Sequence, residues 1–244
     1  MKTLSAKVTF FFIFSIISSK VSSAKNNAYS FDFSYLSTDT SYNYFARPNS
    51  ADLNNRIDLP KNKSTSATRY FIEKNNGSWS WTALYAPLEI NYQFNSNKDF
   101  LFNETGFSRN SKTTVVYKFN SYRFGIRRNR NMNNTRFYYG GILKIREASL
   151  CVVQSNASDC YENIGPVPLL NIGFEQQGQL FYIKSNLDGL YSSRGSAYDI
   201  NIETGLSLSF FKIGMGVRML GGGANSDKVK NFAQFRSIYL NLNL

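Results

Sequence analysis

Charged side chains at every second position are the residues of this sequence that could do acid–base or ion chemistry. They alternate with apolar residues in segments of period-2 pattern, so they should share the face opposite the apolar side chains. Inside a narrow closed sheet such charges must pair, because an unpaired buried charge is strongly unfavourable. We therefore expect a paired network that fills the interior, with an acid/base site or an ion pathway as the alternative. Its predicted members are Glu89, Lys144, Arg146, Glu175, Lys184, Asp188, Glu203 and Arg218.

The absence of histidine excludes several classes of enzyme. Ser–His–Asp and Cys–His nucleophile systems need an imidazole base. Glu89 and Glu175 could serve as a carboxylate pair, but nothing in the sequence sets the separation that a glycosidase requires. Two cysteines without histidine cannot complete a usual zinc site. We therefore predict no enzymatic activity, no metal and no cofactor.

The N-terminus has the pattern of a secretory signal peptide. A basic start is followed by a short apolar stretch, Val8 to Ile17, and by small residues up to Ala24. This stretch is too short to span a bilayer as a helix, although an uncleaved anchor is the alternative. We predict a signal peptide over residues 1–24 and one mature domain over residues 25–244. In an exported chain, Cys151 and Cys160 should form a loop disulfide.

The net charge of +12 points to anionic partners. An exported basic chain should meet lipid headgroups, such as the phosphates of lipopolysaccharide, rather than nucleic acid; a solubilising surface charge is the alternative. A basic cluster from Arg127 to Arg136 is expected in a short solvated turn with interfacial anchors, with phosphate or peptidoglycan contact as the alternative.

The last strand illustrates the pattern that determines the fold class. Its apolar residues, Ile238, Leu240, Leu242 and Leu244, alternate with Tyr239, Asn241 and Asn243. Such a strand can line a soluble core, or it can form a barrel wall with lipid outside and polar groups inside. No mature segment has the apolar length of a transmembrane helix. The aromatic content of 16% fits the girdles of membrane barrels.

The connections between strands favour the membrane barrel. Long and short connections alternate along the chain, as they do in outer-membrane barrels, and predict ten strands, with eight as the alternative. In residues 113–127 the apolar phase changes, and we expect a bulge near Asn120 and Ser121. The long connections are residues 37–66, 95–112, 151–165, 192–197 and 221–231, and the short ones are residues 75–78, 129–134, 176–179 and 210–212.

Three stretches resemble motifs of a family of small, largely uncharacterised bacterial outer-membrane β-barrel proteins. They are Phe119 to Arg123, Val167 to Asn171, and Gly221 to Asp227 followed by Asn231 to Ala233. The resemblance spans the mature chain and implies one closed antiparallel barrel in the outer membrane, without implying an activity. Members of this class usually end in an aromatic residue, whereas this chain ends in Leu244.

The sequence therefore predicts an all-β, up-and-down transmembrane barrel that acts as a monomer. We expect a structural or surface-interaction role through long external loops, with Ile238, Leu240, Leu242 and Leu244 facing lipid in the closing strand. A narrow channel for ions or small solutes is one alternative. A soluble secreted lipocalin-like barrel or sandwich, with its apolar faces turned inward, is the other.

Overall fold

The computed structural model describes residues 27–38, 44–46, 57–59, 64–225 and 230–244. The predicted signal peptide lies outside these residues. No helix in the described ranges is long and apolar enough to cross a membrane. The strands are β1 (Asn27–Thr38), β2 (Tyr44–Ala46), β3 (Ile57–Asp58), β4 (Ser64–Asn76), β5 (Trp79–Ala86), β6 (Glu89–Asn95), β7 (Phe100–Phe102), β8 (Thr105–Phe107), β9 (Lys112–Met132), β10 (Thr135–Gln154), β11 (Ala157–Gln177), β12 (Phe181–Ser192), β13 (Gly195–Ser207), β14 (Lys212–Ala224) and β15 (Lys230–Asn243).

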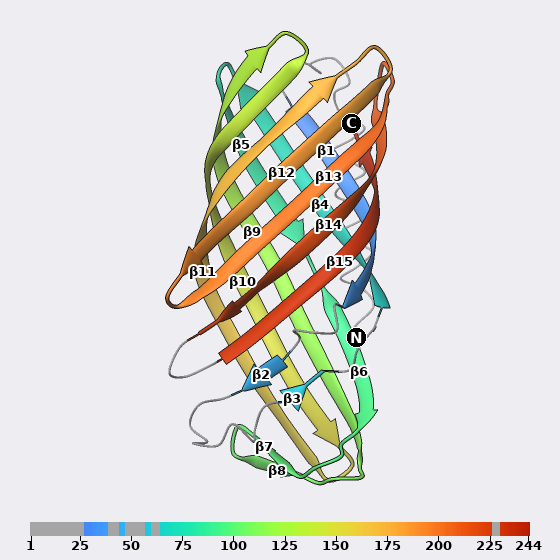
Figure 1. Cartoon of the computed structure of the whole chain (residues 1–244), viewed down its shortest axis with the longest axis vertical. Helices are drawn as coiled ribbons and strands as arrows, with labels where there is room; N and C mark the ends of the chain where they lie inside the picture. Colours follow the sequence, from blue (N-terminus) through green and yellow to red (C-terminus); the bar gives the residue numbers. More distant parts are fainter. Residues whose placement is uncertain (1–26, 39–43, 47–56, 60–63, 226–229) are drawn as a thin grey trace, which may run out of the picture.

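Ten antiparallel strands close into one barrel, in the order β1-β4-β5-β9-β10-β11-β12-β13-β14-β15, with β15 pairing back to β1 (Figure 1). Phe33 lies opposite Leu240 where the barrel closes. β6 continues the path of β5 along β9 after an interruption at Pro87 and Leu88. The predicted closed barrel of ten strands is therefore confirmed.

One wall of the barrel is longer than the rest. β9, β10 and β11 reach furthest toward the lower end of Figure 1, where the β7–β8 hairpin and the short strands β2 and β3 also lie. We call this part, made of β6–β8 and residues 112–120 of β9, 147–154 of β10 and 157–165 of β11, the extension. The C-terminus and the turns before β5, β10, β12 and β14 lie at the opposite, upper end.

Two of the predicted long loops are wrong. Only Ser155 and Asn156 separate β10 from β11, and only Ser193 and Arg194 separate β12 from β13. The polar residues expected in loops instead continue the strand pairing, for example where Val152 pairs with Asp159. These two polar segments therefore form paired strands that lie outside the apolar band, and not irregular loops.

The predicted bulge in β9 is also wrong. Phe119, Asn120 and Ser121 pair in unbroken register with β10. Odd-numbered side chains of β9 face inward throughout: Arg123 is buried in the barrel, and Val115 is buried in the apolar core of the extension. What changes near residue 120 is the side of the wall that carries the apolar residues.

β10 shows the same change at the same level. Lys144 faces inward and is buried, while its neighbour Leu143 is exposed on the outer wall. Further along the strand, Val152 faces inward and is buried, while Ser149 lies on the outer side. The barrel thus has a zone with apolar residues outside and polar residues inside, followed by an extension in which this arrangement is reversed.

Candidate functional site: the barrel interior

Asp199 stands at the centre of a buried ion network. Its two carboxylate oxygens accept hydrogen bonds from Nε and Nη2 of Arg218, both at 2.7 Å. Arg123 Nη2 lies 2.7 Å from the same carboxylate, and Arg123 Nη1 donates to Asp188 at 2.5 Å. Each of these four residues is less than a tenth exposed. Arg123 therefore joins two carboxylates that come from neighbouring strands, β12 and β13.

Amides and a second ion pair complete this layer. Asn171 and Asn186 donate to Asp188 at 2.5 Å and 3.1 Å. Across the barrel, Arg69 Nε donates to Asp32 at 2.5 Å, and these two residues are direct cross-strand partners on β4 and β1. Buried carboxylates are tolerated where several donors satisfy them, so this layer can hold its charges in a fixed arrangement.

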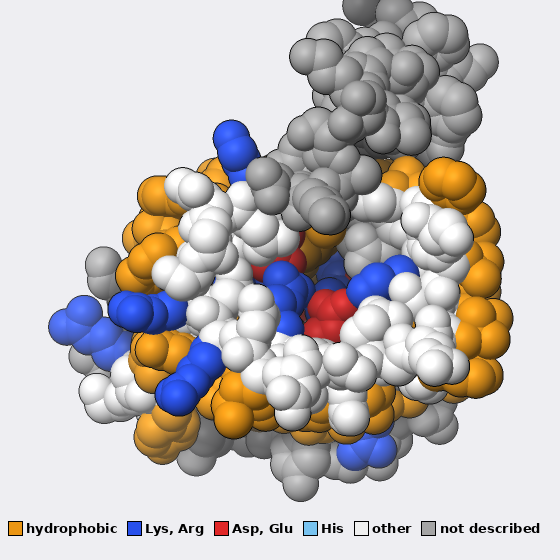
Figure 2. Space-filling model, turned by 90° about the horizontal axis from the view of Figure 1, so that it is seen from above, with side chains coloured by type: hydrophobic (Ala, Val, Ile, Leu, Met, Phe, Trp, Pro, Cys, Tyr) orange, Lys and Arg blue, Asp and Glu red, His pale blue; other side chains and the backbone are white. Residues whose placement is uncertain are grey.

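A second cluster lies nearer the upper end. Arg136 donates to both oxygens of Glu73, at 3.0 Å and 3.3 Å, and to Glu175 at 3.0 Å. Lys212 Nζ donates to the other oxygen of Glu175 at 2.5 Å. Figure 2, which views this end, shows Lys, Arg, Asp and Glu side chains within the hollow and hydrophobic side chains around the outside.

Glu203 is held by neutral donors. Tyr182 donates its hydroxyl proton to Glu203 at 2.5 Å, and Asn241 donates at 3.0 Å. Ser30 in turn donates to Asn241 at 3.0 Å. Three further cations, Arg127, Lys144 and Lys184, lie over aromatic rings at centroid distances of 4.7–5.6 Å.

The interior is closed toward the extension. Apolar side chains from the barrel wall and the β7–β8 hairpin pack into one buried core at that end. A small cavity of ≈ 40 Å³ lies among the charged side chains. The buried core consists of Leu59, Leu88, Ile90, Tyr92, Phe100, Phe102, Phe107, Val115, Leu150, Val152, Leu220 and Phe235.

Most of the predicted network residues face the interior, and Glu89 does not. Glu89 is exposed on the outer side of β6, whereas its neighbours Leu88 and Ile90 are buried in the core of the extension. The predicted alternation of apolar and polar residues is present in this segment. Its apolar face points inward, however, because the segment lies in the extension. The residues found inside are Lys144, Arg146, Glu175, Lys184, Asp188, Glu203 and Arg218.

The basic cluster predicted in a turn is instead divided between two faces of the wall. Arg127 and Arg136 point inward into the network, while Arg128 is exposed outside with its guanidinium 5.6 Å from the ring centre of Trp79. The turn itself consists of Asn133 and Asn134. Further members of the network that the sequence analysis missed are Asp32, Arg69, Glu73, Arg123 and Asp199.

The closing strand has its apolar residues outside. Ile238, Leu240, Leu242 and Leu244 are exposed, whereas Tyr239 and Asn241 are buried in the interior. β15 thus has an apolar outer face and a polar inner face, like the strands beside it.

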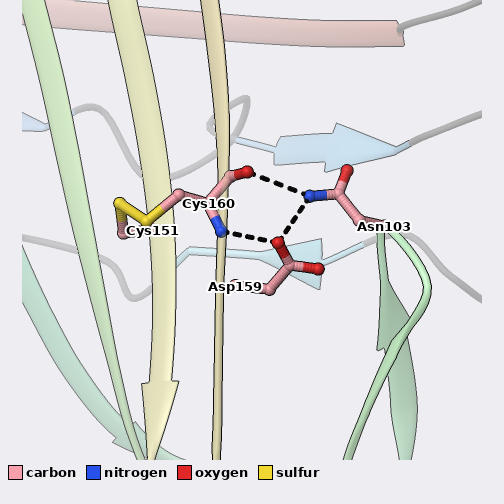
Figure 3. Close-up of a disulfide and its surroundings, with 4 residues drawn as sticks. All are labelled: Asn103, Cys151, Asp159 and Cys160. Atoms are coloured by element: carbon pink, nitrogen blue, oxygen red, sulfur yellow. Dashed lines mark hydrogen bonds between the residues drawn. A yellow bond between two sulfur atoms is a disulfide. The ribbon is translucent and has the colours of Figure 1, made fainter.

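The Cys151–Cys160 disulfide lies in the extension and joins directly paired residues of β10 and β11. Asn103, in the β7–β8 turn, donates to the Asp159 carboxylate at 2.9 Å and to the Cys160 carbonyl at 3.1 Å (Figure 3). Asp159 also accepts from the Cys160 backbone N–H at 2.7 Å. These bonds attach the hairpin to the disulfide-linked strand pair. Within the described residues, no group of His, Cys, Asp and Glu could hold a metal ion.

Comparison with known proteins identifies the fold. No family model matches the chain, and no curated protein sequence matches it. The crystal structure of the outer membrane protease OmpT from Escherichia coli superposes with a TM-score of 0.62 at 9% identity, covering 91% of this chain and 97% of that one. The attachment invasion locus protein Ail of Yersinia pestis gives a TM-score of 0.42 at 10% identity, covering 90% and 99%. The superposition with OmpT shows that the chain has the fold of the bacterial outer-membrane β-barrel proteins.

Proposed function

We propose that the protein is exported by its N-terminal signal and spans the bacterial outer membrane as a monomeric, non-conducting barrel. The extension would stand outside the cell and serve surface interaction. The observation that carries this proposal is the reversal of the apolar face along β9 and β10. Lipid outside favours apolar residues on the outer wall, and water outside favours them on the inner wall.

The outer wall between the upper end and the extension supports membrane insertion. It exposes a continuous apolar surface that is far larger than the scattered apolar residues of a soluble protein. The soluble lipocalin-like alternative fits poorly, because its apolar faces should be buried inside. Exposed members of this band include Phe31, Phe33, Trp81, Phe124, Ile126, Tyr139, Leu143, Leu170, Ile172, Ile202, Met215, Val217, Ile238 and Leu240.

The filled interior supports a non-conducting barrel over the channel alternative. A conducting path would have to pass the Arg123 ion pairs and then the core around Val115 and Val152, both of which are 0% exposed. An ion entering that core would lose its hydration without finding polar partners.

The extension supports a surface role. Its outer face carries Glu147, Ser149 and Glu162, and its shape is held by a disulfide and a docked hairpin. Exposed Arg236, next to the apolar Ile238 on the outer wall, is positioned for contact with a lipopolysaccharide phosphate.

Topology in cells tests this proposal. An epitope inserted between Ser155 and Asn156 should be accessible to antibody on intact cells. The same epitope between Asn133 and Asn134 should become accessible only after the outer membrane is permeabilised. The protein should stay with outer membranes in a high-salt wash and should shift on gels when heated. Release by salt, or equal accessibility of both epitopes, would contradict membrane insertion in this orientation.

Planar-bilayer recording tests the closed interior. The folded protein should give no discrete conductance steps in potassium chloride. Steady single-channel currents would favour the channel alternative.

A further inference from the structure

Arg127 and Lys184 carry positive charge near the upper end without an ion-pair partner. Neither forms an ion pair with a carboxylate in the part of the chain that the structure describes. Both lie over the ring of Phe71, at 5.5 Å and 5.6 Å from its centroid. Arg127 is only 5% exposed, and its buried Nε has no hydrogen-bond partner there. It also lies over the ring of Tyr138, 4.8 Å from its centroid, and donates a 3.5 Å bond from Nη2 to Asn186.

Five other interior cations are already paired with carboxylates. In the deeper layer, Arg69, Arg123 and Arg218 are bound to Asp32, Asp188 and Asp199. Near the upper end, Arg136 and Lys212 already share Glu73 and Glu175, so these carboxylates are engaged. Of the cations that line the small interior cavity, Arg127 and Lys184 are therefore the two without an ion pair among the described residues.

The two side chains line the same cavity. It has a volume of ≈ 40 Å³ and is bounded by Arg127, Lys184, Phe71, Asn186 and Asn201, among others. About 10–15 Å³ of such volume holds one water, so there is room for one small ion with a partial hydration shell. The hollow seen from the upper end in Figure 2 offers a route of entry.

We propose that this cavity is a binding site for a small inorganic anion of the size of chloride, held by Arg127 and Lys184. The Arg127 Nε–H would donate one charge-assisted bond, the Lys184 ammonium would supply a second, and the Asn201 amide could complete the shell. Both cations also lie over the ring of Phe71.

Three carboxylates also line the cavity, and each accepts from other donors; Asp199 accepts from Arg218. Glu203 accepts from Tyr182 and Asn241, and Asp188 accepts from Arg123 and from the amides of Asn171 and Asn186. Lys184 lies directly opposite Glu175 and Glu203 in the paired strands, yet it forms an ion pair with neither of them among the described residues.

Chloride binding can be measured on the folded full-length chain in detergent. In a gluconate background, addition of the protein should broaden the ³⁵Cl NMR line, and unlabelled bromide should reverse the broadening. Arg127→Gln should weaken binding about ten- to hundredfold, the loss expected for a hydrogen bond to a charged group. Lys184→Gln, a milder change in a half-buried side chain, should weaken it about tenfold.

Arg128→Gln is the matched control, because Arg128 is the adjacent residue on the outer wall over Trp79. It should leave the broadening unchanged, and all variants should retain the heat-induced gel shift of a folded barrel. Equal broadening by wild type, Arg127→Gln and Lys184→Gln would overturn the site. A crystal grown in bromide should show anomalous density beside Arg127; density there without any effect in solution would mean binding at crystal concentration only and would also overturn it.

Discussion

Cys151 and Cys160 lie directly opposite each other in β10 and β11, with their Cα atoms 4.1 Å apart, outside the apolar band. The bond therefore links β10 and β11 within the extension rather than within the part of the wall that carries the apolar band. Near it, β11 pairs with β10 on one side, and among the described residues no strand pairs with its other edge before Leu170, where the pairing with β12 begins.

The double variant Cys151→Ser/Cys160→Ser should loosen the extension and spare the barrel. Loop-closure entropy gives an upper value of about 3 kcal/mol for a loop of this length. We expect faster proteolysis at Ser155 and Asn156 and an unchanged heat-induced gel shift. Loss of the gel shift would show that the disulfide supports the whole barrel. The reduced wild-type protein is the matched control.

The ion pair between Asp32 and Arg69 can be tested separately from the Asp199 cluster. Asp32→Asn alone should destabilise the barrel by about 3–5 kcal/mol, because it leaves Arg69 buried without its charge partner. The double variant Asp32→Asn/Arg69→Met should be less destabilised than the sum of the single variants. Urea unfolding in lipid vesicles measures the three free energies. Additive effects would show that the pair contributes no coupling.

The sequence was sufficient to predict which residues share a face, but not always which side of the wall that face occupies. Leu240 and Ile90 both alternate with polar neighbours, yet Leu240 is exposed outside and Ile90 is buried inside. Alternation shows that one face of a strand meets apolar surroundings and the other face meets polar ones. Which face points outward depends on the medium around the barrel, and that medium differs between the apolar band and the extension. Glu89 was misplaced for this reason.

The sequence was also insufficient to predict which side chains contact one another across the barrel. Arg136 bonds to Glu73, 63 positions earlier, and no local pattern indicates this contact. The basic run from Arg127 also suggested a turn, because the run does not reveal how far a strand continues. Closure and register determine these contacts, and they follow from the whole barrel rather than from one segment.

An added charge should have opposite consequences at two positions on the same face of β10. Leu143→Arg places the charge in the outer apolar band and should destabilise the folded barrel by roughly 2–4 kcal/mol in vesicles. Ser149→Arg lies on the outer face of the extension and should change the free energy of unfolding little. Heat-shift assays after refolding into vesicles measure both. Equal effects would place Ser149 in the lipid or Leu143 outside it.

Alkaline pH should loosen the core of the extension. Burial raises the pKa of Tyr117 from 10.0 to about 12, with Arg146 acting in the opposite direction. The neutral phenol is thus favoured in the folded state, so its contribution is complete below pH 10 and is lost as the pH rises through 12. Near-UV circular dichroism from pH 9 to 12 should report this loss. Tyr117→Phe should reduce the pH dependence, whereas Tyr191→Phe, at an exposed position, should not.

Pro166 and Pro168 should protect the free edge of β11 against strand addition. The Cys160 carbonyl faces this edge, since it accepts from Asn103, and the Gln177 N–H faces β10 instead. Backbone groups alternate in direction along a strand, so Pro166 and Pro168 occupy positions whose N–H would point to the free edge. Proline removes those donors, which is a known protection of edge strands.

Pro166→Val/Pro168→Val should therefore expose two new donors beside the exposed Ile164 and promote self-association of the folded protein. Size-exclusion chromatography with light scattering in detergent should show dimers or larger species for this variant and monomers for the wild type. Adding Ile164→Lys should restore the monomer, because a charged side chain on an edge opposes pairing. If the double variant stays monomeric at the concentrations where wild type is studied, the two prolines serve another purpose, such as fixing the path of β11 past the end of β12.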